Sequence, residues 1–164
     1  MRDVVLIIHD VRSCHNVGSL LRTAEGLGVS MVYFTGYTPY PQSANDDRLP
    51  HISRKLADQI SKTALGAELT QAWEHVESVD DLLELLTRNG YQLVGLEQAK
   101  DSVQLHDYKA PDKTALLLGR EVEGIDPALL AKLDTTLEIP MYGSKESFNV
   151  VQAAAMALYQ LRFY

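Results

Sequence analysis

Cysteine is almost absent from this chain of 164 residues, since Cys14 is the only one. An internal disulfide and a multi-cysteine metal site are therefore excluded, and no metal is expected, which agrees with a reducing compartment. Long hydrophobic runs are lacking too. The amino-terminal apolar run is too short for a signal peptide with a cleavage site, and no run approaches the length that spans a membrane. We therefore expect a cytoplasmic protein with no membrane contact.

A surplus of positive charge is also lacking. The chain has 22 acidic and 15 basic residues, for a net charge of −7. This balance argues against a surface that is basic all over and binds nucleic acid nonspecifically, so any such role needs a local patch. Hydrophobic residues make up 46% and charged residues 23%, as in folded globular proteins. The length predicts a single domain over residues 1–164.

Short apolar runs alternate with helical patterns along the chain. Residues 4–8 form a β-branched apolar run typical of a strand buried on both faces, and residues 16–27 show helical spacing, with Gly28 placed to end the helix. Further strands are predicted at 31–34, 91–97, 114–118 and 135–139, and further helices at 80–88, 127–133 and 150–161. This alternation predicts an α/β domain with a largely parallel sheet and helices on both faces.

Three loops that follow predicted strands carry small polar residues or glycines. They supply Asn16, Gly18 and Arg22 from the first loop, Gly119, Glu121 and Gly124 from the second, and Ser147 and Asn149 from the third. Ligands bind beyond the carboxyl ends of parallel strands, so the loops could form one site. The set contains no dinucleotide-binding glycine fingerprint, Walker loop or Ser/His/Asp order, and it favours positioning over proton shuttling. For the third loop, ordinary capping is the alternative, with Ser147 as N-cap and Asn149 in the first helical turn.

The densest basic cluster follows a loop at 36–50 that is rich in Pro, Gly, Ser, Asn and Asp. Its members are Arg48, His51, Arg54, Lys55 and Lys62. The cluster is a candidate phosphate-binding patch, and the four Arg and Lys residues in it are the predicted RNA ligands. A solvated helix face is the alternative, because nearby aspartates dilute the charge.

Residues 16–24 read NVGSLLRTA, residues 118–125 read LGREVEGI, and residues 139–150 read IPMYGSKESFNV. In this order and spacing, the three segments resemble the motifs of the SpoU/TrmH family of RNA 2′-O-ribose methyltransferases. The resemblance covers nearly the whole chain. It implies the SPOUT fold with a C-terminal trefoil knot, S-adenosylmethionine as methyl donor, a ribose in tRNA or rRNA as substrate, and a homodimer.

The resemblance also implies roles for individual residues. Arg22 matches the family's catalytic arginine, and Asn16 would hold the ribose or Arg22 itself. Glu121 and Ser147 would orient these groups, and Asn149 would fix the loop or the substrate. The cofactor would be held around Leu96, Gly119, Ile139, Met141, Ser147 and Phe148. Because a guanidinium is a poor general base, we expect Arg22 to clamp a phosphate and stabilise the developing alkoxide, with the base left open.

Two residues depart from the family pattern. Arg120 stands where relatives often carry Asn or another small residue, and Phe148 replaces the more usual Leu. Arg120 could compete with Arg22 for an RNA phosphate or point to solvent. The family's separate RNA-binding extension has no counterpart before the first predicted strand, so RNA recognition is expected to rest on the catalytic domain and its dimer.

The last predicted helix is apolar nearly all round at residues 150–158. One core-facing stripe would not cover it, which favours burial against a second subunit. Burial inside one chain, in a sheet covered on both faces, is the alternative.

Two other functions remain open. One is a noncatalytic RNA-binding homologue of the same fold, which the acidic balance and Arg120 favour. The other is an α/β enzyme acting on a small nucleotide. A nucleophilic Cys14, as in base methylation, is disfavoured because the neighbouring side chain of His15 should point away from it and nothing else suggests an activated thiolate. The pair at residues 9–10, His-Asp, is expected to be strand-end structure.

Overall fold

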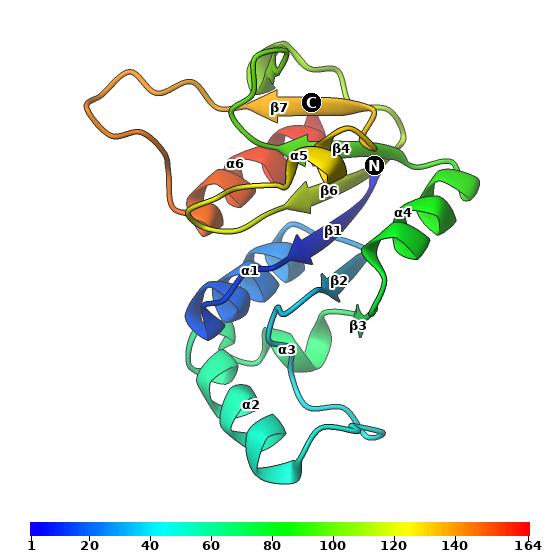
Figure 1. The fold of residues 1–164 in the computed structure, drawn as a ribbon, viewed down its shortest axis with the longest axis vertical. Coiled ribbons are helices and arrows are strands. Elements are labelled where there is room, and N and C mark those ends of the chain that lie inside the picture. Colours follow the sequence, from blue (N-terminus) through cyan, green and yellow to red (C-terminus); the bar gives the residue numbers. More distant parts are fainter.

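One seven-stranded sheet runs through the computed structural model, which describes residues 1–164 (Figure 1). The strands are β1 (Asp3–His9), β2 (Met31–Thr35), β3 (Trp73–His75), β4 (Gln92–Leu96), β5 (Val103–Gln104), β6 (Lys113–Leu118) and β7 (Thr135–Glu138). Their order is β3-β2-β1-β6-β4-β7-β5, and every neighbouring pair is parallel. The predicted parallel α/β sheet is confirmed.

Helices cover both faces of the sheet (Figure 1). They are α1 (Cys14–Gly26), α2 (Pro50–Ala64), α3 (Ala67–Thr70), α4 (Val79–Arg88), α5 (Pro127–Leu130) and α6 (Val150–Phe163), with one 3₁₀ turn at Leu105–Asp107. Val4, Leu6 and Ile8 of β1 pack in one core with α1, α2 and α6. Val5 and Ile7 pack in a second core with α4 and α5. Since side chains alternate along a strand, the β-branched run of β1 supplies both cores.

The predicted strands and helices are found with small shifts at their ends. The helix predicted at 127–133 ends early, as α5, at Leu130. The structure adds α2, where the sequence suggested only a possible solvated helix face, and α3. It also adds the short strands β3 and β5, one at each edge of the sheet. None of the helices has both the length and the apolar character needed to cross a membrane.

Helix α1 begins at Cys14 because Ser13 is its N-cap, with the Ser13 hydroxyl accepting the Asn16 backbone N–H at 3.2 Å. Gly18 lies in this helix, not in a ligand-binding loop. It is buried, and a Cβ there would overlap the Ile60 carbonyl and the Thr63 hydroxyl of α2. Gly18 therefore permits the close packing of α1 against α2.

The segment between β7 and α6 projects from the sheet edge as a loop (Figure 1). Helix α6 then returns to the α1 face, where Ala154, Leu158 and Leu161 are fully buried. Asn149 caps α6, since its side-chain oxygen accepts the Val151 N–H at 2.8 Å. The alternative with Ser147 as N-cap is therefore wrong: the helix begins at Val150, directly after Asn149. The trefoil knot stays a prediction.

Candidate active site

A cleft of about 290 Å³ opens beyond the carboxyl ends of β4, β6 and β7. Its walls include Leu96 and Glu97 at the end of β4, Gly119 after β6 and Ile139 after β7. The projecting loop contributes Ser147. This edge of a parallel sheet is where ligands bind in open α/β folds.

Two glycines shape the loop between β6 and α5. The backbone N–H groups of Arg120 and Gly124 each donate to the other's carbonyl, at 3.1 and 3.2 Å. A Cβ on Gly119 would lie 2.7 Å from the Gly124 carbonyl, closer than real Cβ contacts allow. Gly124 has φ of 74°, and a Cβ there would overlap the Glu97 carboxylate. The turn is therefore closed to larger residues at both positions.

Glu97 is a site residue that sequence reasoning missed. Its carboxylate accepts the Ile125 N–H at 2.9 Å and the Gln98 N–H at 2.8 Å, which ties the end of β4 to the loop after β6. The position of Glu97 directly after a predicted strand was the one available signal.

The cleft is rich in negative charge. Its lining carboxylates are Glu97, Glu121, Glu138 and Glu146, against Arg120 as the one basic residue. Apolar side chains complete the lining, among them Leu96, Ile139 and Phe148. This arrangement suits a ligand that carries positive charge beside an apolar or aromatic part.

Three segments far apart in the sequence meet beside the cleft. The Glu121 carboxylate accepts the backbone N–H groups of Arg12, at 3.3 Å, and Ser13, at 3.2 Å, just before α1. It also lies 3.4 Å from the Asn16 side-chain nitrogen, which donates to it. The Asn149 side-chain nitrogen donates to the Asn16 side-chain oxygen at 3.5 Å. The structure thus brings Asn16, Glu121 and Asn149 together.

These contacts set the charge state of Glu121. Burial acts to raise the pKa of its carboxyl, but hydrogen bonds from backbone N–H groups, including those of Ser13 and Arg12, and from the Asn16 side chain outweigh that effect. The pKa is lowered below its ordinary value. Glu121 is therefore an ionised hydrogen-bond acceptor near neutral pH.

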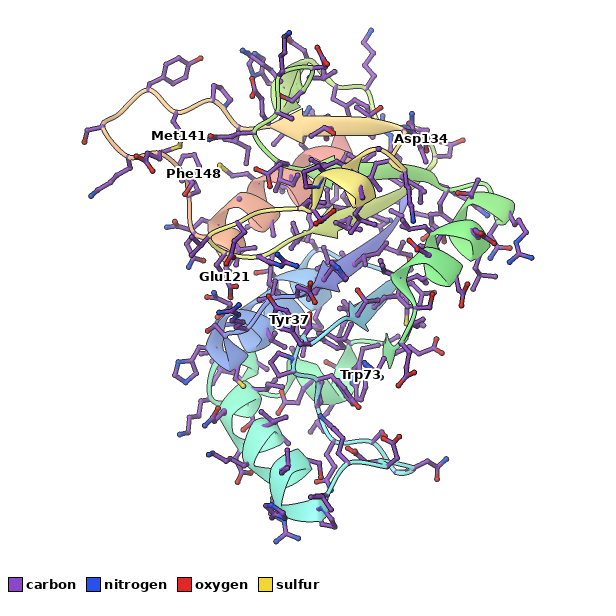
Figure 2. The ribbon with its side chains drawn as sticks, in the orientation of Figure 1. Tyr37, Trp73, Glu121, Asp134, Met141 and Phe148 are labelled. Atoms are coloured by element: carbon purple, nitrogen blue, oxygen red, sulfur yellow. The ribbon has the colours of Figure 1, made fainter.

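The remaining predicted site residues are placed differently. Of the six predicted cofactor residues, Met141 alone does not line the cleft. Figure 2 shows Met141 on the projecting loop that also carries Phe148. Arg22 is exposed on α1 outside the cleft, and no ion pair joins it to Glu25 or another acid. Its guanidinium is thus open to a ligand.

Arg120 has a partner at the end of β1. Its guanidinium lies 3.4 Å from a carboxylate oxygen of Asp10, a residue only 7% exposed. Asp10 has φ of 58°, and its other carboxylate oxygen accepts the Tyr37 N–H at 3.1 Å. Arg120 therefore joins the loops after β1, β2 and β6, a role that neither sequence alternative included.

The surroundings of His9 and Cys14 favour structural roles for both residues. Burial lowers the pKa of His9 despite the neighbouring charge of Asp10, and its ring Nδ1 lies 2.8 Å from the Thr35 hydroxyl. Burial raises the pKa of the Cys14 thiol, which disfavours a thiolate nucleophile. No group of three or more His, Cys, Asp or Glu side chains is arranged to hold a metal ion.

The predicted RNA-binding cluster is divided. The Arg48 guanidinium donates to both carboxylate oxygens of Asp46, at 2.5 and 2.8 Å, and to the carbonyls of Tyr40 and Pro41. These bonds hold the loop after β2 and use most of the N–H donors of the Arg48 guanidinium. Arg54, Lys55 and Lys62 are exposed on α2 without ion pairs and stay predicted phosphate ligands.

Comparison with known proteins gives a family match over nearly the whole chain. The model of the SpoU rRNA Methylase family matches residues 3–159. A tRNA (guanosine(18)-2′-O)-methyltransferase of Aquifex aeolicus is 28% identical over 166 residues, which cover 97% of this chain and 68% of that protein. The 23S rRNA (guanosine-2′-O-)-methyltransferase RlmB of Neisseria meningitidis is 30% identical over 159 residues, or 97% of this chain and 58% of that protein.

Solved structures have the same fold. The AdoMet-bound rRNA methyltransferase of Sinorhizobium meliloti matches with a TM-score of 0.82 and 21% identity, over 98% of this chain and 56% of that one. The TrmH/SpoU tRNA modifying enzyme of A. aeolicus matches with a TM-score of 0.80 and 23% identity, over 99% of this chain and 75% of that one. This chain therefore spans little more than half of some relatives and about two thirds to three quarters of others.

Proposed function

The chain belongs to the SpoU rRNA methylase family, and on that premise we propose that it transfers a methyl group from S-adenosylmethionine to a ribose 2′-hydroxyl of tRNA or rRNA. Both relatives described above are named as guanosine 2′-O-methyltransferases of RNA. One observation carries the proposal: Asn16, Glu121 and Asn149 meet beside a cleft at the carboxyl edge of the sheet.

S-adenosylmethionine fits the chemistry of this cleft. Its sulfonium and ammonium groups are cations, which suit the four lining carboxylates. Its adenine suits apolar side chains such as Leu96, Ile139 and Phe148, and Gly119 lets the backbone approach closely. When bound, the cofactor supplies a methyl group that is already activated for transfer.

The work left to the protein is mostly positioning of the ribose hydroxyl in line with that methyl group. Arg22 has an exposed guanidinium without an ion-pair partner, so it can bind the phosphate beside the target ribose. The same positive charge stabilises the negative charge that develops on the oxygen as its proton leaves. A guanidinium is a poor general base, so Arg22 is not the group that takes the proton.

Asn16 is held from two sides. Its side-chain nitrogen donates one hydrogen to Glu121, and its oxygen accepts from Asn149. A carboxamide nitrogen carries two hydrogens, so one remains for a ribose oxygen. Glu121 and Asn149 thus act as positioning residues for Asn16.

A homodimer is part of the proposal. Helix α6 leaves Met156, Tyr159 and Phe163 exposed by 37%, 50% and 48%, and the rings of the last two lie 5.1 Å apart. A second copy of the chain would cover this apolar face and add surface for RNA recognition. We also propose residues 1–164 as one catalytic domain and a cytoplasmic location, where tRNA and rRNA are available.

Transfer of a tritiated methyl group tests the proposal. The protein is incubated with labelled S-adenosylmethionine and total RNA, and the RNA is digested to nucleosides. Label in a 2′-O-methyl nucleoside supports ribose methylation. Label in a methylated base contradicts it. Calorimetric binding of the cofactor without any transfer would instead indicate a noncatalytic RNA-binding homologue, and transfer to free nucleotides only would indicate a small-nucleotide enzyme.

A further inference from the structure

A second hollow, of about 330 Å³, lies beside the candidate active site. The loop after β2 forms much of it through Tyr37, Pro39 and Tyr40, and Arg12 and Leu56 complete its sides. We propose that this hollow binds an unpaired nucleobase of the RNA, next to the nucleotide that is methylated. The inference rests on the proposed function and identifies a substrate feature that it leaves open.

The two tyrosines of the hollow differ in what covers their rings. The Arg48 guanidinium lies 3.6 Å from the Tyr40 ring centroid, and the His75 ring stacks on Tyr40 at 4.1 Å. Two groups this close to one centroid must lie on opposite faces, so Tyr40 has no face left for a base. Tyr37 is 48% exposed, and the Arg12 guanidinium lies over its ring at 5.4 Å. Tyr37 is therefore the half-exposed aromatic side chain of the hollow, with one guanidinium over its ring, on which a base can stack.

The charge of the hollow is opposite to that of the cleft. Its lining contains no carboxylate, in a protein with a net charge of −7. Of its two arginines, Arg48 is paired with Asp46, so Arg12 supplies the positive charge. The cleft is lined by four carboxylates and one arginine. A cationic cofactor thus suits the cleft, while an anionic RNA strand suits the hollow. Aromatic platforms beside guanidinium groups are the recurring means of binding single-stranded RNA, in which the base stacks and the cation meets the backbone.

The hollow is connected to the proposed catalytic residues by hydrogen bonds. The Arg12 backbone N–H donates to Glu121 at 3.3 Å, and the Tyr37 backbone N–H donates to Asp10 at 3.1 Å. Asp10 in turn pairs with Arg120, the neighbour of Glu121. Figure 2 shows Tyr37 and Glu121 at the carboxyl ends of the strands, on the loops after β2 and β6, and β1 lies between these two strands. A strand whose ribose reaches Asn16 can therefore also reach the hollow.

The expected substrate feature is an unpaired nucleotide. A base inside a duplex is stacked on both faces and cannot enter a hollow of this kind, whereas bases of loops and bulges can be splayed out. The ring of Tyr37 offers stacking but few fixed donors, so the hollow should accept different bases.

The test measures RNA affinity of four variants of the intact protein with S-adenosylhomocysteine present. The probe is a fluorescein-labelled oligoadenylate of about ten nucleotides, read by anisotropy over a range of salt concentrations. The variants are Tyr37→Ala, Tyr37→Phe, Arg12→Ala and, as a matched control, Arg88→Ala in the exposed last turn of α4. Calorimetric cofactor binding checks that each variant is folded.

Tyr37→Ala should weaken binding about tenfold without changing the salt dependence, and Tyr37→Phe should stay within about twofold of the parent protein. Arg12→Ala should lower the slope of log affinity against log salt by about one, and Arg88→Ala should change neither quantity. Parent-like affinity of Tyr37→Ala overturns the inference. If that variant fails to bind cofactor, an unchanged slope for Arg12→Ala overturns it, as does a Tyr37→Phe variant that binds about ten times more weakly.

The outcome for the hollow can be separated from the outcome for the function. Methyl transfer to ribose combined with parent-like RNA affinity of Tyr37→Ala would contradict base binding in the hollow and leave the proposed function standing. Absence of methyl transfer, with RNA affinity that still depends on Tyr37 and Arg12, would contradict the proposed activity and support the hollow as an RNA-binding site.

Discussion

Glu121 and Asn16 are 105 positions apart in the sequence, yet a carboxylate oxygen of Glu121 accepts a hydrogen bond from the Asn16 side-chain nitrogen at 3.4 Å. The same carboxylate accepts two backbone N–H groups just before α1. The loop after β6 and the start of α1 are therefore held in one arrangement, which fixes Asn16 at the edge of the proposed cofactor cleft.

Replacing Glu121 by Gln tests this relationship. Gln keeps the size of the side chain but replaces one acceptor oxygen by a donor, so one of the N–H groups loses its partner. We expect cofactor affinity to change less than the single-turnover rate, because three other carboxylates still line the cleft. The rate should fall about tenfold to 100-fold, because Asn16 is misplaced. Glu123→Gln is the control, since this exposed residue does not line the cleft. Equal rates for the two variants would exclude a positioning role for Glu121.

Gly119→Ala should weaken cofactor binding without greatly lowering stability. The added Cβ would lie 2.7 Å from the Gly124 carbonyl and would push apart the loop that lines the cleft. We expect affinity for S-adenosylmethionine to fall at least about tenfold in calorimetry. Gly26→Ala is the matched control, because its Cβ meets nothing within 4 Å in the last turn of α1. That change should raise the free energy of unfolding by about 0.5–1 kcal/mol and leave binding intact. Unaltered binding by Gly119→Ala would refute the placement of the cofactor.

Met156→Glu should separate the proposed dimer. In a symmetric interface the new carboxylates of two subunits would lie near each other in an apolar setting, which is strongly unfavourable. Sedimentation at micromolar concentration should give a dimer for the parent protein and a monomer for the variant. Leu69→Glu serves as control, since Leu69 is 85% exposed on α3 and the variant should remain dimeric. A monomeric parent protein would contradict the role assigned to α6.

Stability should fall in mildly acidic solution through His9. Burial lowers the pKa of His9 in the folded protein, so the unfolded chain binds more protons below its own pKa of about 6.5. The contribution of His9 to the free energy of unfolding is thus fully present above about pH 6.5. It is lost as the pH falls toward the pKa of His9 in the folded protein. Urea unfolding between about pH 7.5 and pH 5.5 should show a weaker pH dependence for His9→Gln. His15→Gln, at an exposed position, should follow the parent protein; identical slopes for all three proteins would disprove the effect.

The sheet could be predicted because its central strands carry strong local signals. The run in β1 supplies two separate cores, and such a two-sided apolar strand requires helices on both faces. The edge strands gave no such signal. Strand β3 consists of Trp73, Glu74 and His75, and β5 of two residues, so neither has an apolar run or an alternation long enough to recognise. Their pairing depends on the strand already placed beside them.

The site could be predicted only as far as local chemistry determines it. Two good N-cap residues, Ser147 and Asn149, lie two positions apart, and the structure selects the one adjacent to the apolar run. Partners distant in sequence could not be foreseen. Arg120 pairs with Asp10 across 110 positions. For Arg48, the nearby Asp46 offers two oxygens to its planar guanidinium, so the structure pairs this residue within its own loop.

The most direct test of the proposed mechanism is the single-turnover rate of methyl transfer by Arg22→Ala on an RNA that the parent protein methylates. Arg22 is exposed and unpaired, so folding and cofactor binding should be nearly unchanged. The rate should fall by a factor of about 100 or more, because the lost charge acts on the transition state. Arg22→Lys should recover little of it, since lysine lacks the planar fork that binds phosphate. A rate for Arg22→Ala close to that of the parent protein would contradict the assignment of Arg22 and the ribose-methylating site built around it.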